Sequence, residues 1–243
     1  MHLRINEIPR LIDISAVRTD VSVEEVKQVA AVAAEYNFIC AFAMPCHTEL
    51  LVQELREYDS VLVGGVVGFP SGADTTKVKV ETTRELLSFG CDEIDMVINV
   101  GALKSGENDL VYEDIKAVVE AAGDTPVKSI LEIAYLSDEE IVRGSRIAAE
   151  AGVAFVKTGT GWAGKPTTVG TIELLHYAVD GNAKIKAAGG VRTLEDLESM
   201  YEAGCSRFGI SLTSALNILE QAYERENLEF KRPQPRLSEK SEE

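Results

Sequence analysis

Two lysines at the ends of predicted strands have the residue type and setting to do chemistry. Lys157 lies in the apolar run Ala154–Thr158, and Lys186 lies in Lys184–Ala188. Glycine-rich chain follows each run, so we expect both side chains to project into a cleft. A solvated lysine is protonated and a poor nucleophile, whereas a desolvated lysine beside a second cation can attack a carbonyl carbon as a free amine. The pair therefore predicts Schiff-base chemistry.

Other ionisable residues accompany the two lysines on neighbouring predicted strands. Asp95 lies in the apolar run Glu93–Asn99, where a carboxylate is costly unless it is paired. Lys128 and Glu132 belong to the strand that follows. Any one of these residues alone would most simply form a structural ion pair. Their convergence with the two lysines favours a catalytic site, because burying them all needs a reason.

The elements that must position these residues alternate along the chain as strand and helix. The expected strands are Arg10–Ile14, Phe38–Phe42, Val61–Val67, Glu93–Ile98, Val127–Ile133, Ala154–Lys157, Ala183–Ala188 and Ser206–Ile210. The helical patterns include Val23–Tyr36, Thr76–Ser88, Leu110–Ala122, Glu139–Ala151, Thr171–Val179 and Leu194–Ala203. This alternation predicts a single (β/α)₈ barrel over residues 1–224, with an open doubly wound sheet as the alternative.

Capping boxes, in which a hydroxyl is followed three residues later by a carboxylate, mark the starts of three helices. They are Ser22/Glu25, Ser137/Glu140 and Thr193/Asp196. Residues 225–243 form a polar tail that contains Pro233 and Pro235, and we expect its last ten residues to be mobile.

The turns after the last two strands have features of a phosphate site. Gly189, Gly190 and Arg192 follow the seventh strand, and Gly209 and Ser211 lie at the end of the eighth. Barrels often bind phosphate there, because glycine lets backbone N–H groups approach an anion and a helix N-terminus favours negative charge. The alternative is two ordinary strand-to-helix turns.

A dinucleotide-like motif, G-x-G-x-x-G, occupies Gly159–Gly164. Lys165 and Pro166 follow it directly, so we expect the next helix to begin near Thr167 or later. In a true dinucleotide site the third glycine lies within the helix. A mobile loop that closes over the substrate is the better interpretation.

Composition excludes several classes of function. The formal net charge of −16 argues against binding to nucleic acids or anionic membranes, which require a basic face. The three histidines lack metal-binding spacing, and the four cysteines form no C-x-x-C pair. The first residues lack the apolar core of a signal peptide. We therefore expect a cytoplasmic protein with reduced thiols and no metal.

Four segments resemble signatures of the deoxyribose-phosphate aldolase family. They are Val67–Ala73, Cys91–Gly106, Phe155–Thr158 and Lys184–Thr193, and the resemblance extends over about Arg10 to Ala222. It implies a (β/α)₈ barrel that needs no metal or organic cofactor and acts on a small molecule, cleaving 2-deoxy-D-ribose 5-phosphate to acetaldehyde and D-glyceraldehyde 3-phosphate.

The resemblance also implies roles for individual residues. Lys157 would form the Schiff base, Lys186 would be the cation that lowers its pKa, and Asp95 would relay protons. Lys128 would give electrostatic support at the mouth of the site. The other expected contacts with substrate or phosphate are Thr158, Gly161, Gly189, Gly190, Arg192, Gly209 and Ser211.

The chain departs from the family pattern around the substrate pocket. Gly159 stands in place of a serine, Leu212 in place of the second of two serines, and Ile133 in place of a threonine. The first strand and the segment after the second strand also differ. These departures leave two alternatives open: a related Schiff-base aldolase with another aldehyde, ketone or sugar, and a non-catalytic barrel. A homo-oligomer is possible, but no interface can be identified in the sequence.

Overall fold

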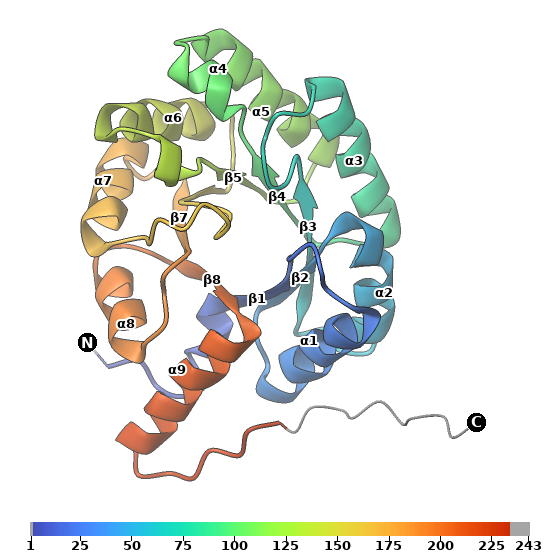
Figure 1. The fold of residues 1–243 in the computed structure, drawn as a ribbon, viewed down its shortest axis with the longest axis vertical. Coiled ribbons are helices and arrows are strands. Elements are labelled where there is room, and N and C mark those ends of the chain that lie inside the picture. Colours follow the sequence, from blue (N-terminus) through green and yellow to red (C-terminus); the bar gives the residue numbers. More distant parts are fainter. Residues whose placement is uncertain (1, 234–243) are drawn as a thin grey trace.

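The protein, described here by a computed structural model over residues 2–233, forms a closed barrel of parallel strands. The strands follow one another around the barrel in chain order, and helices surround them (Figure 1). The predicted single (β/α)₈ barrel is therefore confirmed, and the open sheet is excluded. Each strand is followed by a helical crossover, which is the connection that parallel neighbours need.

The strands are short, and their bounds agree with the predicted runs to within a few residues. They are β1 (Ile12–Ala16), β2 (Cys40–Ala43), β3 (Leu62–Val67), β4 (Glu93–Val97), β5 (Val127–Ile130), β6 (Phe155–Lys157), β7 (Lys184–Ala188) and β8 (Arg207–Ser211). The helices are α1 (Val23–Tyr36), α2 (Pro45–Leu55), α3 (Thr76–Phe89), α4 (Val100–Lys104), α5 (Asn108–Ala122), α6 (Asp138–Glu150), α7 (Val169–Val179), α8 (Leu194–Glu202) and α9 (Leu212–Arg225).

Local sequence signals fix several helix starts. All three predicted capping boxes are present, at the N-termini of α1, α6 and α8. Helix α7 begins at Val169 after the N-cap residue Thr168, as the proline at 166 indicated. The structure thus supports treating 159–165 as a loop rather than as the start of a helix.

Some boundaries differ from the prediction for local reasons. Residues Pro9–Leu11 form a 3-10 helix, so β1 begins at Ile12 instead of Arg10. Strand β5 ends at Ile130 because Glu132 has a positive φ of 56° and opens a 3-10 turn.

Side chains alternate along each strand between two buried regions: the core between barrel and helices, and the inside of the barrel. Apolar side chains such as Ile94 and Met96 belong to the main core, which they build with residues of the surrounding helices. Their sequence neighbours Glu93 and Asp95 face the inside of the barrel, where they meet side chains from β5, β7 and β8. Because successive side chains point to opposite faces of a strand, one strand serves both regions.

Part of the predicted tail packs on the barrel. Phe230 contacts the rings of Tyr36 and Tyr223, and the Tyr36 hydroxyl donates to the backbone oxygen of Lys231 at 2.5 Å. Residues 230 and 231 of the predicted polar tail therefore contact the barrel. Residues 234–243, for which we predicted mobility, lie outside the described residues.

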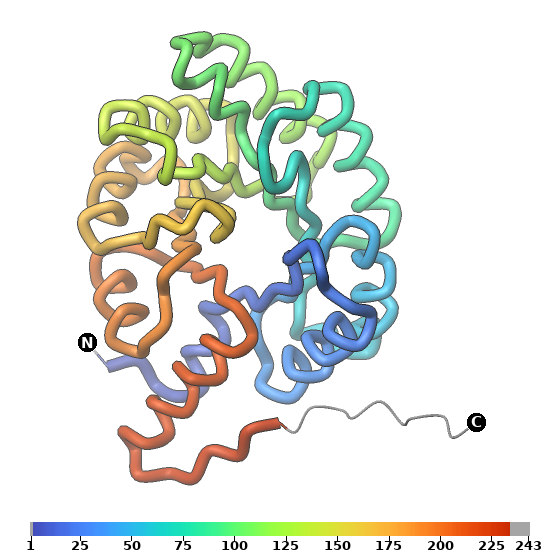
Figure 2. The backbone as a smooth tube through the Cα atoms, viewed as in Figure 1, coloured from blue at the N-terminus to red at the C-terminus, as the bar shows by residue number. Residues whose placement is uncertain are grey.

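The N-terminal segment lies beside the end of α9 (Figure 2). Arg225, at the end of α9, donates to the backbone oxygen of Leu3 at 2.5 Å. Within residues 2–233, no helix is both long enough and apolar enough to cross a bilayer.

Candidate active site

A cavity of about 320 Å³ opens at the C-terminal ends of the strands. Lys157 and Lys186 line it, together with residues of the loops after β1, β3, β6, β7 and β8. A cavity of this size suits a small phosphorylated sugar or aldehyde. The sequence-based expectation that both lysines reach one cleft is met.

Lys157 is the last residue of β6, and only 8% of its side chain is exposed. Its Nζ atom lies 2.7 Å from Oδ2 of Asp95. Burial lowers the pKa of Lys157 to about 8; the Asp95 carboxylate opposes this change, and the ammonium groups of Lys186 and Lys128 add to it. Lys186 thus acts in the expected direction, but burial is the larger cause. At pH 7 about one-tenth of Lys157 is then the free amine, whereas a lysine with the ordinary pKa has less than about one part in a thousand.

Asp95 lies in the middle of β4 and is fully buried. Its Oδ2 atom accepts hydrogen bonds from Lys157 and Lys186, both at 2.7 Å, and its Oδ1 atom accepts one from Lys128 at 3.1 Å. Burial alone would raise the pKa of Asp95, but the three ammonium groups hold it well below its usual range. Asp95 is therefore an ionised acceptor shared by three lysines.

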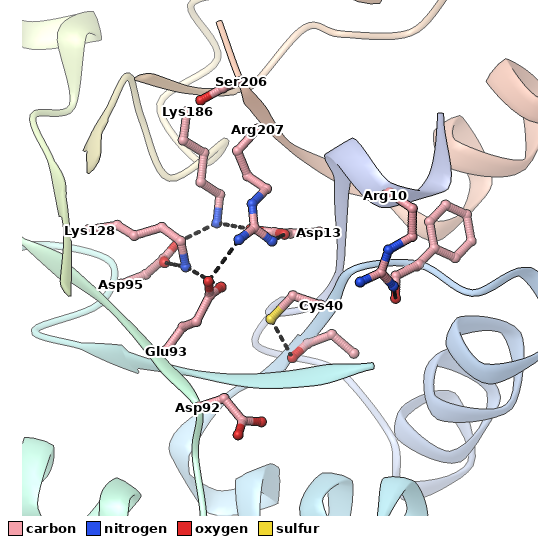
Figure 3. A network of polar contacts seen from close by, with 12 residues as sticks. Arg10, Asp13, Cys40, Asp92, Glu93, Asp95, Lys128, Lys186, Ser206 and Arg207 are labelled. Carbon is pink, nitrogen blue, oxygen red and sulfur yellow. Dashed lines mark hydrogen bonds and ion pairs between the residues drawn. The ribbon is translucent and has the colours of Figure 1, made fainter. Parts of the chain in front are cut away.

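Three further charged residues, which the sequence analysis did not assign to the site, extend this network (Figure 3). Arg207 donates to Asp13 at 2.8 Å and to Glu93 at 2.7 Å. Asp13 lies 2.6 Å from Lys186 Nζ at an angle unfavourable for a hydrogen bond, so this contact is ionic. All three occupy the first or second position of a strand, whereas the candidate residues were chosen near the C-terminal ends of the strands. A charged residue between apolar neighbours, as in Ile12–Ile14, is the signal that could have found Asp13; Glu93 and Arg207 follow polar residues and lack it.

Lys128 does not lie at the mouth of the site, as the resemblance implied. It is fully buried below the cavity, where it donates to Glu93 at 2.6 Å. The ring of Phe42 lines the cavity and contacts both lysines: Lys186 Nζ lies 4.3 Å and Lys128 Nζ 5.1 Å from its centroid. A Cβ atom at Gly64 would lie 2.1 Å from that ring, so the glycine makes room for it.

Most of the predicted phosphate contacts gather on one side of the cavity. Gly161, Gly189, Gly190, Arg192, Gly209 and Ser211 all line it. Only glycine fits at 190, because φ is +88° and a Cβ atom would lie 2.5 Å from Pro166 Cβ. Ser211 caps the N-terminus of α9, and its hydroxyl lies 3.1 Å from that of Ser214, a cavity residue that the sequence analysis missed.

Thr158 is an exception among the predicted substrate contacts. It is fully buried and does not line the cavity. Its hydroxyl accepts from the Ala188 amide at 2.9 Å and contacts the Thr167 hydroxyl at 2.8 Å. Thr158 therefore joins β6 to β7 and to the segment before α7, and we no longer place it in contact with substrate.

The loop after Lys157 is fastened across the mouth of the cavity. Trp162 donates from Nε1 to the backbone oxygen of Val17 at 3.1 Å and meets the ring of Phe69 edge-on, with 5.9 Å between centroids. The aromatic pair and the indole hydrogen bond form a strap over one side of the entrance. The segment is a loop, as expected, and closure of this loop over a substrate stays a prediction.

The family departure at Gly159 has a structural counterpart in the buried carboxylate of Glu132. Glu132 accepts hydrogen bonds from the amide and the hydroxyl of Thr160. A Cβ atom at Gly159 would lie 2.7 Å from Glu132 Oε1. The missing side chain therefore leaves space for a carboxylate that anchors the loop.

The described residues offer one group of side chains spaced for a metal ion: Asp13, Cys40 and Glu93. Both carboxylates already contact Lys186, Lys128 or Arg207. A metal cation would have to displace these charges, and burial raises the pKa of the Cys40 thiol well above its usual value. The group does not fit a metal ion.

Comparisons with known proteins agree with this geometry. The sequence model described as DeoC/LacD family aldolase matches residues 11–211. The deoxyribose-phosphate aldolase of Sinorhizobium medicae is 45% identical over 215 residues, covering 88% of this chain and 87% of the relative. That of Methanothermobacter thermautotrophicus is 44% identical over 215 residues, covering 88% and 94%. A tetrameric deoxyribose phosphate aldolase from Aeropyrum pernix superposes with a TM-score of 0.81 at 26% identity, covering 92% of this chain and 93% of that one. The chain belongs to the DeoC/LacD family of aldolases.

Proposed function

We propose that this protein is a Schiff-base aldolase that cleaves 2-deoxy-D-ribose 5-phosphate to acetaldehyde and D-glyceraldehyde 3-phosphate. One observation carries the proposal: a lysine of depressed pKa, Lys157, lines the cavity and shares the carboxylate of Asp95 with Lys186. Relatives that are 41–45% identical over most of this chain have the name of this activity. An amine that is desolvated and adjacent to another cation is the form of lysine that condenses with carbonyl compounds.

The reaction begins with attack of the Lys157 free amine on the aldehyde carbon, C1, of the open-chain sugar. The carbinolamine that forms loses its hydroxyl as water and becomes a protonated imine. Loss of water requires a proton, and Lys186 and Asp95, joined by a 2.7 Å hydrogen bond, are placed to deliver and recover it. These two residues act as the general acid and base.

Cleavage follows by breaking the bond between C2 and C3. The C3 hydroxyl loses its proton and C3 becomes the aldehyde carbon of glyceraldehyde 3-phosphate, while the electron pair of the broken bond moves into the imine and gives an enamine. Protonation of the enamine at C2 restores an imine. Water then hydrolyses this imine, which releases acetaldehyde and the free amine of Lys157.

The phosphate is assigned to the side of the cavity formed by the loops after β7 and β8. Arg192 brings a guanidinium group to this side, and the N-terminus of α9 brings backbone N–H groups. Leu212 removes one hydroxyl that the family usually supplies there. The Ser214 hydroxyl, one turn along the same helix, is a candidate replacement.

A direct test is turnover of 2-deoxyribose 5-phosphate with both products quantified, beside unphosphorylated 2-deoxyribose under the same conditions. We expect equal amounts of acetaldehyde and glyceraldehyde 3-phosphate, and a higher kcat/KM for the phosphorylated sugar. Cleavage of the unphosphorylated sugar with equal or higher kcat/KM would favour the alternative of a related aldolase with another substrate. Failure to cleave either sugar would contradict the proposal.

Assembly and location are part of the proposal. The name of the Aeropyrum pernix relative describes a tetramer, which supports a homo-oligomer here. The four cysteines are free thiols, which is usual for proteins of the reducing cytoplasm. Size-exclusion chromatography with light scattering would determine the oligomeric state.

A further inference from the structure

The charged residues inside the barrel form a closed ring in which cations and carboxylates alternate. Arg207 pairs with Asp13 at 2.8 Å, Asp13 with Lys186 at 2.6 Å, and Lys186 with Asp95 at 2.7 Å. The ring returns from Asp95 to Lys128 at 3.1 Å, then to Glu93 at 2.6 Å, and Glu93 meets Arg207 at 2.7 Å. Figure 3 shows this circuit across the barrel.

The charges of this ring balance without Lys157. Three carboxylates alternate with three cations, so the ring is neutral. Lys157 lies outside the circuit and touches it only at Asp95, whose Oδ2 atom Lys186 already occupies. When Lys157 is protonated, the buried cluster has a net positive charge that no carboxylate balances. Burying an uncompensated charge is costly.

The charged and titratable groups around Lys157 come from every neighbouring part of the barrel. Asp95 on β4 is its only salt-bridge partner among the described residues. Lys128 on β5 and Lys186 on β7 disfavour its protonation, and burial does so more strongly. The remaining groups near the site are Asp13 on β1, Cys40 on β2, Glu93 on β4, Glu132 after β5, Arg207 on β8, and Arg18 and Arg192 at the cavity wall.

We propose that Arg207 and Glu93 are positioning residues that together set the balance between the free amine and the protonated form of Lys157 by closing the neutral ring. Arg207 favours the free amine, and Glu93 favours the protonated form. Neither residue lines the cavity, so neither contacts substrate. Both act through the ring: Arg207 through Asp13 and Lys186, and Glu93 through Lys128. The inference rests on the proposed function only in treating Lys157 as the reactive amine.

The proposal assigns opposite effects to the loss of the two charges. Glu93→Gln leaves the ring with an excess positive charge, so the midpoint for protonation of Lys157 should fall. Arg207→Gln leaves an excess negative charge, so the midpoint should rise. A charge of this kind inside a protein shifts a neighbouring pKa by about one pH unit or more. The double variant restores neutrality and should return the midpoint close to that of the wild type.

The measurement is competitive labelling with trace acetic anhydride from pH 6 to pH 11, with acetylation of the Lys157 peptide quantified by mass spectrometry. The rate reports the free-amine fraction without any aldehyde or sugar. Arg225 and Glu198 form a matched pair outside the barrel, at 2.7 Å, and Arg225→Gln and Glu198→Gln should leave the midpoint unchanged. Circular dichroism verifies that each variant is folded.

Midpoint shifts of opposite sign in the single variants, with recovery in the double variant, are the expected result. Shifts of the same sign, no shift in either variant, or a double variant further from wild type than both singles would overturn the inference. If one variant fails to fold, Asp13→Asn and Lys186→Gln remove an anion and a cation at other ring positions, with the same expected signs. If wild type labels as expected but never forms an imine with aldehydes, the proposed function fails while this inference stands.

Discussion

Two clusters of buried charge differ in how many cations share each carboxylate. Between α3 and α5, Lys79 is fully buried and its Nζ atom lies 2.5 Å from Oδ2 of Asp114. Lys79 also donates to the backbone oxygen of Val97 at 3.0 Å, and Thr76 donates to Asp114 Oδ1 at 2.8 Å. Inside the barrel, Lys157 shares Asp95 with two other lysines.

This difference separates a structural lysine from a reactive one. The pair of Lys79 and Asp114 is balanced, its polar atoms have partners, and neither residue lines the candidate active site. Lys157 has no carboxylate of its own, and burial holds its pKa at about 8. Burial alone therefore does not mark a catalytic lysine; the surplus of cations around its carboxylate does.

The largest expected effect removes the reactive amine itself. Borohydride reduction in the presence of acetaldehyde should add an ethyl group to wild-type Lys157, and Lys157→Met should abolish this adduct and the lyase activity. Lys184→Met, which removes an exposed lysine of β7, is the control and should retain both. Full adduct formation in Lys157→Met would assign the nucleophile to another residue.

The next largest effect is expected when the carboxylate shared by the three lysines, that of Asp95, is replaced. Asp95→Asn removes an anionic partner of Lys128 and Lys186, and it removes the base of the proposed proton transfers. We expect kcat to fall by about 10²–10⁴-fold. Unfolding should become easier by about 3–5 kcal/mol, because buried cations lose their partner. Denaturant titration and steady-state kinetics measure the two losses, and an active variant of unchanged stability would contradict the shared role of Asp95.

A change in the balanced cluster should affect stability alone. Lys79→Met leaves the buried Asp114 carboxylate without its cation, which should lower the free energy of unfolding by about 3–5 kcal/mol. Replacing both residues with Lys79→Met and Asp114→Leu should recover much of that loss. The pH dependence of kcat/KM should match that of wild type in both variants. A changed pH profile would show that the two clusters are coupled.

The smallest expected effect concerns substrate recognition. Arg192→Ala removes one charged hydrogen-bond donor from the proposed phosphate side, worth about 1.5–3 kcal/mol. We expect kcat/KM for 2-deoxyribose 5-phosphate to fall about tenfold or more, while that for unphosphorylated deoxyribose stays unchanged. Equal losses for both sugars would place the phosphate elsewhere.

Much of the fold followed from local patterns. Capping boxes and alternating apolar residues predicted the strand order and the starts of α1, α6 and α8. Helices α2, α4 and α9 were not among the predicted segments. Helix α2 begins with Pro45 after an N-cap residue whose side chain forms no cap hydrogen bond, α4 has only five residues, and α9 begins directly at the end of β8 without an intervening turn. A helix that lacks a capping side chain, or that is too short for apolar residues to recur at helical spacing, is hard to predict from a single sequence.

The candidate site was predicted in part. Strand-end positions correctly brought Lys157 and Lys186 to one cavity and to Asp95. The ring below it depends on the stagger of the barrel, which places Lys186 beside Arg207 in register and brings Glu93 of β4 within reach of β8. That stagger is set by closure of the whole sheet, so the partners of Arg207 could not be read from its own segment.

The central claim is that Lys157 loses its proton at a much lower pH than an ordinary lysine does. The most direct measurement is an NMR titration of protein labelled with ¹³C at lysine Cε, with Lys157 assigned by its absence from the spectrum of Lys157→Met. The account predicts a midpoint near pH 8 for this resonance. A midpoint at or above about 10.4, the value for a free lysine, would contradict it.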